Sequence, residues 1–268
     1  MPMSITFTKS SPVLVGPSSM APATHNTTIN LSSFDKGLAF LPSKSFYVFK
    51  HAMQHKPAAE TVRTALSHAL THYFPLAGRL VRGGDDELRI ACTGEGVAFV
   101  AASANCSLDD VKLFDRPFAE QLLQELSASL AGVEGFRESD DPLLLIQVTE
   151  FSCGGFVIGV TWNHGVADAE GCTQFLRAVA ELARGLPQPS ILPVSCGDDS
   201  LSRRIRRWLL HTGCHVRSKD PRSAHIFAVN LRKEVGAKYG YYGNCVTSAV
   251  AVPASGDVAN GDIVSKAW

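Results

Sequence analysis

Residues 143–162 decide the fold: LLLIQVTEF runs from Leu143 to Phe151, and FVIGVTW follows from Phe156 to Trp162. Both runs are almost wholly apolar and rich in β-branched and aromatic residues, which is typical of strands in the middle of a covered sheet. Cys153-Gly154-Gly155 lies between them and favours a tight turn. The stretch therefore predicts a buried β-hairpin.

The hairpin leads directly into His164-Gly165-Val166-Ala167-Asp168, a segment with a polar residue at each end. Apolar residues then recur at helical spacing through Leu182, and Gly185 and Pro187 follow as stop signals. His164 is thus expected where a strand ends and a helix is about to begin. An imidazole in such a place can serve as a general base, since its ordinary pKa of about 6.5 lies near working pH.

The residues before the hairpin predict further helices and strands. Apolar positions recur at spacings of three and four over 58–74, which predicts a helix that Pro75 ends. Residues 78–82 and 87–93 flank a Gly-Gly-Asp-Asp turn and predict a second hairpin. A strand over 97–101 would extend it to a meander packed on the helix, and 117–130 has helix-forming composition.

Composition excludes several classes of function. The chain has 268 residues, with 25 Lys and Arg against 25 Asp and Glu, so no net field recruits nucleic acid or an anionic membrane. No apolar run approaches the roughly 20 residues of a membrane-spanning helix, and the N-terminus lacks a signal-peptide pattern. The 7 cysteines have no metal-ligand spacing and are expected to be free thiols, which indicates a cytoplasmic protein without a metal.

Five ordered stretches carry a family resemblance. The chain resembles the BAHD acyltransferases, the plant-type branch of the chloramphenicol-acetyltransferase-like fold. The resemblance rests on the stretches Leu31-Ser32-Ser33-Phe34-Asp35, Tyr73-Phe74-Pro75-Leu76-Ala77-Gly78-Arg79-Leu80, Ile146-Gln147-Val148-Thr149 leading through Cys153-Gly154-Gly155 to His164-Gly165-Val166-Ala167-Asp168, Val229-Asn230-Leu231-Arg232, and Tyr242-Gly243-Asn244-Cys245. It implies an α+β fold, a two-layer α/β sandwich.

The resemblance also implies an activity, the transfer of an acyl group from acyl-CoA to an alcohol or amine acceptor. The family's catalytic histidine falls on His164, which would take the acceptor proton as the acceptor attacks the thioester carbonyl. Acyl-CoA is then a co-substrate, no cofactor is called for, and full-length members are expected to be monomeric. The residues do not specify the acyl donor or the acceptor.

Asp168 has two interpretations. Its spacing from His164 would place both on one face of a helix, as in a dyad. The resemblance instead implies that Asp168 turns away from the substrate and pairs with Arg232, which holds the loop that aims His164, and we favour this structural role. Two interpretations also stay open for Thr161 and Asn163: they line the pocket, or they are ordinary strand-end residues.

The chain departs from the family towards its C-terminus. The Asp-Phe-Gly-Trp-Gly motif of relatives does not occur in it. We therefore expect a C-terminally truncated member with an N-terminal acyltransferase domain over 1–186, a shortened linker or crossover over 187–225 and an incomplete second domain over 226–268. A catalytically silent fragment that at most binds a ligand or a partner is the alternative to an active enzyme.

Overall fold

The predicted hairpin forms the centre of the main sheet. A computed structural model describes residues 5–19, 27–53, 56–111, 120–129, 136, 140–194, 201, 203–205, 207 and 225–251. In it, β8 (Leu144–Phe151) and β9 (Phe156–Asn163) pair antiparallel, with Gln147 opposite Gly159. Gly154 adopts a φ of 83° in the turn, a conformation that glycine reaches without strain. This prediction is confirmed.

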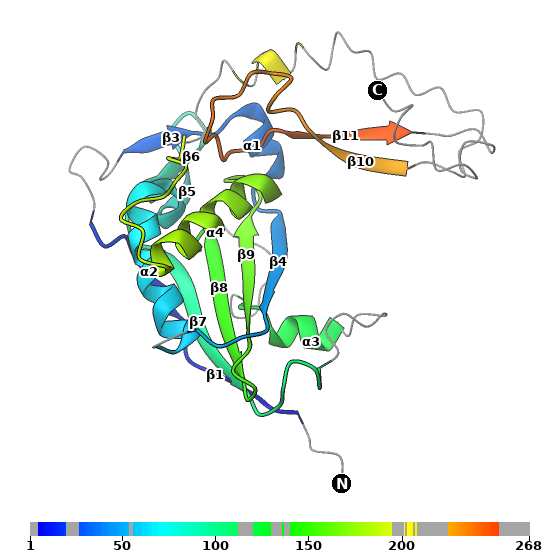
Figure 1. Cartoon of the computed structure of the whole chain (residues 1–268). Coiled ribbons are helices and arrows are strands. Elements are labelled where there is room, and N and C mark those ends of the chain that lie inside the picture. The colour runs from blue at the N-terminus through cyan, green and yellow to red at the C-terminus, as the bar shows by residue number, and fades with distance from the viewer. Residues whose placement is uncertain are drawn as a thin grey trace, which may run out of the picture. The chain divides into compact units, whose positions relative to one another are not determined.

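Six strands make up this sheet (Figure 1). Its order is β1 (Phe7–Lys9), β7 (Val97–Ala104), β8, β9 and β4 (Pro42–Phe49), and β2 (Val13–Val15) also pairs with β7. The pair β7–β8 is parallel, whereas the other pairs are antiparallel. The sheet is therefore mixed, and the expected α+β class is confirmed.

A separate sheet of three strands corrects one expectation. It has the order β3 (Thr28–Asn30), β6 (Leu88–Ala91) and β5 (Arg79–Arg82). The hairpin β5–β6 is as predicted, but the meander is wrong, because β7 joins the main sheet instead of pairing with β6. A parallel partner such as β8 lies across a long crossover connection, which local sequence patterns do not reveal.

Two long helices cover one face of the main sheet (Figure 1). They are α2 (Ala58–His72) and α4 (Ala169–Ala183), and their apolar sides share one core with the inward residues of β8 and β9. A 3₁₀ helix, Phe74–Ala77, follows α2 and contains Pro75. The helix predicted over 58–74 and its proline-terminated end are thus confirmed.

The opposite face of the sheet is covered in part by the segment around α3 (Glu120–Glu125). A Cβ on Gly159 would lie 2.0 Å from the main-chain oxygen of Leu126, so this segment lies close against β9. The short helix α1 (Ser33–Leu38) precedes β4 in the chain. The helix predicted over 117–130 ends at Glu125, earlier than expected, and the predicted residues 117–119 and 130 lie outside the described residues.

The chain divides into two compact units. One comprises Met1–Gly197 together with Gly240–Asn244, and the other comprises Asp198–Tyr239 and Cys245–Trp268. The second contains an antiparallel pair, β10 (His225–Asn230) and β11 (Val246–Ala251). Much of the predicted crossover over 187–225, and residues 252–268, lie outside the described residues, so the predicted domain boundaries stay a prediction.

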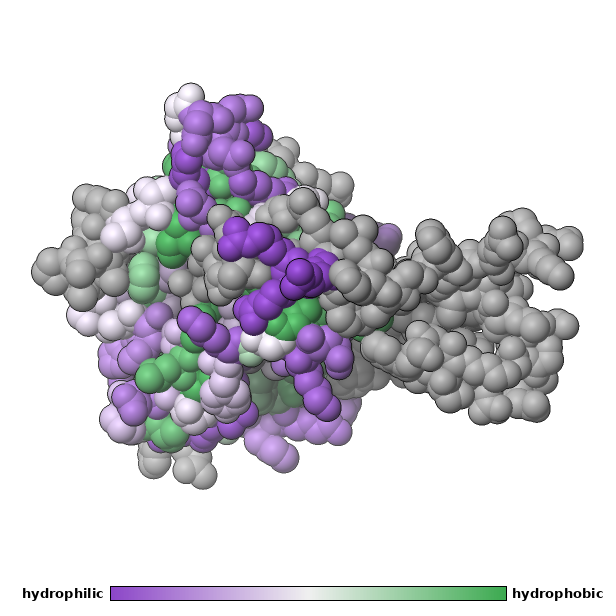
Figure 2. Space-filling view, turned by 90° about the horizontal axis from the view of Figure 1, so that it is seen from above, coloured by the Kyte–Doolittle hydropathy of each residue, from purple (hydrophilic) through white to green (hydrophobic). Residues whose placement is uncertain are grey.

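Figure 2 shows polar and apolar residues interspersed on the face seen from above. Within the described ranges, no helix is both long enough and apolar enough to cross a bilayer.

Candidate active site

The end of β9 places His164 at the edge of the main sheet. The Asn163 main-chain N–H donates to the Leu143 carbonyl at 2.9 Å, and the His164 N–H donates to the Leu41 carbonyl at 2.8 Å. The Trp162 indole N–H donates to the Ala167 carbonyl at 2.9 Å, which ties the loop after the strand back onto it. These bonds hold the loop from His164 to Asp168 in one conformation.

Asp168 is the N-cap of α4. Its Oδ1 accepts from the Gly171 main-chain N–H at 2.9 Å, and the residue is 1% exposed. Since α4 begins at Ala169, His164 lies before the helix, and helical i, i+4 spacing does not relate the two side chains. The geometrical basis of a His164–Asp168 dyad is therefore missing.

The side chain that meets the His164 ring is Asn244. Its Oδ1 lies 2.9 Å from His164 Nδ1. Its Nδ2 donates to the main-chain oxygen of His164 at 2.7 Å and to Asp35 Oδ1 at 2.8 Å. Asn244 is 1% exposed, so these contacts are screened from water. Each polar atom of this amide has a partner.

The contacts of Asn244 fix the tautomer of His164. Both Nδ2 protons point at oxygens, one of them on a carboxylate, and the flipped amide would set its own oxygen against both. Asn244 Oδ1 therefore faces the ring and needs a donor, so His164 Nδ1 carries the proton. The lone pair is left on Nε2, the atom that can accept a proton from a substrate.

Asp35 supports this arrangement from α1. Its Oδ2 accepts from the Ser32 main-chain N–H at 3.0 Å, while its own N–H donates to Ser32 Oγ at 3.1 Å, which forms a capping box. Asp35 is 0% exposed, and burial raises the pKa of its carboxyl although the hydrogen bonds from Ser32 and Asn244 act in the opposite direction. Its carboxylate therefore caps α1 and holds Asn244 at once.

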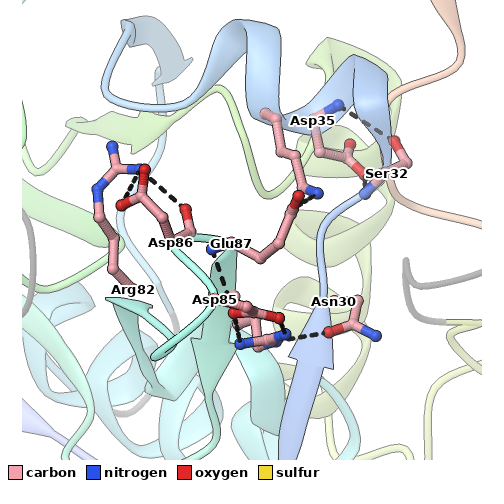
Figure 3. Close-up of polar contacts among 9 residues, drawn as sticks. Asn30, Ser32, Asp35, Arg82, Asp85, Asp86 and Glu87 are labelled. Atoms are coloured by element: carbon pink, nitrogen blue, oxygen red, sulfur yellow. Dashed lines mark hydrogen bonds and ion pairs between the residues drawn. The ribbon is translucent and has the colours of Figure 1, made fainter.

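Figure 3 shows how Asp35 differs from the charged residues near it. Asp35 and Ser32 point at each other at the start of α1, whereas Arg82 with Asp86, Asp85 with Arg89, and Lys36 with Glu87 form pairs at the neighbouring β5–β6 turn. The partners in these three pairs are partly or fully exposed, so each pair contributes little to stability.

Residues 240–244 are held in the first unit by contacts with α4 and with the segment after it. Gln174 Nε2 donates to the Gly240 carbonyl at 2.9 Å and to Tyr73 Oη at 3.0 Å. The Val194 N–H also donates to the Gly240 carbonyl, at 2.8 Å. A Cβ on Gly171 would lie 1.8 Å from the Tyr242 carbonyl, so only glycine allows this approach. Asn244 is thereby brought to His164.

Sequence reasoning identified His164 but missed Asn244 and Asp35. Both lie in stretches that carried the family resemblance, so a signal was present in the chain. Arg232 lies in the second unit, where its Nη1 donates to Asn230 Oδ1 at 3.3 Å. Its pairing with Asp168 stays a prediction. The parts of the chain that the structure describes contain no group of three or more His, Cys, Asp or Glu side chains placed to hold a metal ion.

Comparison with known proteins shows the family of this chain. A family model described as the transferase family matches residues 3–203. Acyl transferase 15 of Oryza sativa subsp. japonica is 38% identical to this chain over an alignment of 321 residues, gaps included. The alignment covers 98% of this chain and 73% of that protein. This chain belongs to the BAHD acyltransferase family. The family match includes Asp35, His164 and Asp168.

Other BAHD relatives are matched over a smaller part of their length. Benzyl alcohol O-benzoyltransferase of Petunia hybrida is 39% identical over 200 residues, which cover 71% of this chain and 41% of that protein. Among solved structures, vinorine synthase has a TM-score of 0.65 and 23% identity, with 92% of this chain and 71% of that chain covered. TRI101 of F. sporotrichioides, complexed with coenzyme A and T-2, has a TM-score of 0.56 and 14% identity, with 90% and 72% covered. These structures confirm the fold.

Proposed function

We propose that this chain transfers an acyl group from acyl-CoA to an alcohol or amine acceptor, with His164 as the general base. The observation that carries the proposal is the contact between Asn244 Oδ1 and His164 Nδ1 at 2.9 Å, since it leaves Nε2 free to accept a proton. Two of the similar proteins support the two substrate classes: TRI101 is complexed with coenzyme A, and the Petunia relative is named for benzyl alcohol.

The proposed reaction needs no covalent intermediate on the protein. His164 Nε2 takes the proton of the acceptor hydroxyl or amine while the acceptor atom bonds to the thioester carbonyl carbon. The carbon–sulfur bond then breaks, the thiolate of coenzyme A leaves, and the imidazolium gives its proton to the thiolate, which returns His164 to its neutral form. A thiol pKa near 8.5 makes this thiolate a good leaving group, so the sulfur can leave before it is protonated, whereas the neutral acceptor needs the base.

Asn244 and Asp35 would stabilise the imidazolium formed in this reaction. Asn244 Oδ1 accepts a hydrogen bond from His164 Nδ1–H throughout, and Asp35 Oδ1 accepts one from Asn244 Nδ2 and so polarises the amide. In this proposal Asp168 and Arg232 pair to hold the loop that aims His164, as the family resemblance implies. In this proposal no metal or prosthetic group takes part, the protein acts in the cytoplasm without a nucleic-acid or membrane partner, and full-length family members are monomeric.

A second candidate is a catalytically silent member that at most binds a ligand or a partner. It predicts no release of free thiol from any acyl-CoA, whatever the acceptor.

The experiment that tests both candidates measures thiol release from acetyl-, malonyl-, benzoyl- and hydroxycinnamoyl-CoA, with and without alcohol and amine acceptors. We expect acceptor-dependent release, and we expect His164→Ala to lower it about 10²- to 10⁴-fold with an unchanged melting temperature. His68→Ala, on the exposed side of α2, is the matched control and should keep full turnover. Full turnover in His164→Ala would refute the mechanism.

A further inference from the structure

Thr161 and Asn163 project from the face of β9 that lies away from α2 and α4. Side chains alternate along a strand, and Val160 and Trp162 lie in the core shared with those helices. Val157, on the other face, packs in a separate cluster with Leu126. Thr161 and Asn163 share that other face, and Asn163 immediately precedes His164.

Each of these two side chains has a buried polar atom for which the described part of the chain supplies no hydrogen-bond partner. Thr161 is 7% exposed and Asn163 is 0% exposed, and the unpartnered atoms are Thr161 Oγ1 and Asn163 Nδ2. Leaving such a group unsatisfied costs about 1–3 kcal/mol. Native structures rarely keep that cost without a use for the group.

The orientation of the Asn163 amide is fixed by its other half. Asn163 Oδ1 accepts from the Phe40 main-chain N–H at 3.2 Å and from the Gly165 main-chain N–H at 2.9 Å. A flipped amide would set its NH₂ group against two donors. Nδ2 is therefore a fixed donor that has no acceptor among the described residues.

The same face has a partnered threonine for comparison. Thr149 on β8 is also buried, and its Oγ1 accepts from Gln147 Nε2 at 2.9 Å, which in turn donates to the Glu125 carbonyl at 2.7 Å. Gln147 Oε1 is a third buried atom without a partner, and it lies opposite Gly159, two residues from Thr161. Going away from His164 along this face, the donor Asn163 Nδ2 is therefore followed by the hydroxyl of Thr161 and then by the acceptor Gln147 Oε1.

We propose that Thr161 and Asn163 form a subsite that binds a neutral hydroxyl group of the acyl acceptor, distinct from the group that is acylated. A hydroxyl group both donates and accepts, so it satisfies Asn163 Nδ2 and Thr161 Oγ1 together. The protein groups are uncharged, and a buried ion would cost far more than a buried hydroxyl. This subsite rests on the proposed function, because its ligand is the acceptor that His164 deprotonates.

The kinetic test compares benzyl alcohol with 2-, 3- and 4-hydroxybenzyl alcohol as acceptors of benzoyl-CoA. We expect the wild type to prefer at least one hydroxylated isomer, through a lower KM. Thr161→Val should lower that preference about 5- to 10-fold, as one uncharged hydrogen bond predicts, and should leave benzyl alcohol unaffected. Asn163→Asp, which keeps the acceptor for Phe40 and Gly165 but removes the donor, should also abolish the preference.

Thermal melts of the unliganded protein provide the readout that a purely structural role would not give. Thr161→Val removes a hydroxyl that no described residue bonds, so the melting temperature of the variant should equal or exceed that of the wild type. Thr149→Val is the matched control: it removes a partnered hydroxyl on the same face, and it should lower the melting temperature without changing the preference. A Thr161→Val protein that melts as low as Thr149→Val and keeps the preference overturns the subsite.

Failure of the proposed function can be told apart from failure of the subsite. If the wild type releases no thiol with any acyl-CoA, binding is read from the rise in melting temperature with each of the four alcohols. A larger rise with a hydroxybenzyl alcohol than with benzyl alcohol, lost in Thr161→Val, supports the subsite alone. Equal rises in the two proteins refute it.

Discussion

Asp35 and Glu181 are both buried carboxylates, yet their pKa values shift in opposite directions. They are 0% and 4% exposed. Burial raises the pKa of Asp35, whereas hydrogen bonds from the side chain and main chain of Ser190, with a contribution from Arg177, lower the pKa of Glu181 to about 2. The ionised form is therefore disfavoured at Asp35 and favoured at Glu181.

The partners of the two carboxylates explain this difference. Glu181 accepts from Ser190 Oγ at 2.6 Å, from the Ser190 N–H at 2.8 Å and from Arg177 Nε at 3.0 Å, so a cation contributes. Asp35 accepts from the neutral groups of Ser32 and Asn244. Glu181 stabilises the chain that follows α4, while Asp35 is kept at some cost beside the base. Glu181 thus contributes to stability, whereas Asp35 contributes to the arrangement of the site.

A third buried carboxylate, Asp168, extends the comparison and gives the largest expected effect on folding. Asn is as good an N-cap as Asp, so Asp168→Asn keeps the cap of α4 and removes only the charge. If Asp168 pairs with Arg232, we expect Asp168→Asn and Arg232→Met each to lower the free energy of unfolding by about 3 kcal/mol. Thermal or urea melts measure it.

The two variants also separate the roles of Asp168. A structural pair predicts lost stability together with lost turnover. Wild-type melts with reduced turnover in both variants would instead place Asp168 among the groups that act directly on the substrate. Asp168→Ala removes the cap as well as the charge. Its stability should therefore lie about 1 kcal/mol below that of Asp168→Asn, and this difference measures the cap alone.

Asp35→Ala should have the next largest effect, this time on catalysis. Its loss releases Asn244 Nδ2, so the amide can turn and His164 loses its fixed tautomer. We expect kcat to fall about 100-fold, the scale of a small misplacement of a catalytic group. Ser32→Ala removes the other half of the capping box, and it should cost about 1 kcal/mol of stability with kcat unchanged. Equal kcat values in the two variants would contradict the role of Asp35.

Glu181 should account for much of the fall in the free energy of unfolding at acidic pH. Because its folded pKa of about 2 lies below the ordinary 4.5, its contribution is present above about pH 4.5 and is lost as the pH falls towards 2. Glu181→Gln should therefore lower stability by about 1–2 kcal/mol at neutral pH and much less near pH 2. Asp35 has the opposite sign, since its raised pKa favours the fold below its ordinary 3.8 and opposes it as the pH rises. Urea melts between pH 2 and pH 7 test both slopes.

Arg177→Met is the smallest change and sharpens the comparison. The Arg177 side chain is 61% exposed and sits at i, i+4 to Glu181, so we expect a loss of about 0.3–0.5 kcal/mol. The Ser190 donors remain, and they should keep the acid limb of the melt almost unchanged. A large shift of that limb would mean that the cation, and not Ser190, holds the pKa of Glu181 down.

Much of the fold followed from local patterns in the chain. The apolar, β-branched runs and the turn chemistry of 143–162 predicted β8 and β9, and the apolar spacing of 58–74 predicted α2. The partner of β7 did not follow, because a parallel pair joins residues separated by a crossover, and no local pattern encodes which strand is adjacent. Hence the meander was predicted where two sheets exist.

The site was predicted less completely. His164 stood out because a strand ends beside it and a helix follows. Asn244 lies 80 residues further on and shows no periodicity, so its contact with His164 depends on tertiary structure alone. The unpartnered atoms of Thr161 and Asn163 were equally invisible, because a sequence states which groups are polar but not which of them find partners.

The short segment Gly240–Asn244 has a consequence for how the protein is made. It belongs to the first unit, although the residues on both sides of it belong to the second. A ribosome synthesises roughly 5–20 residues per second, and domains fold as their residues emerge. Every strand of the main sheet can be in place once residue 163 has left the exit tunnel. Asn244, which orients His164, is synthesised at least several seconds later. The main sheet of a nascent chain can therefore fold before His164 is oriented for catalysis.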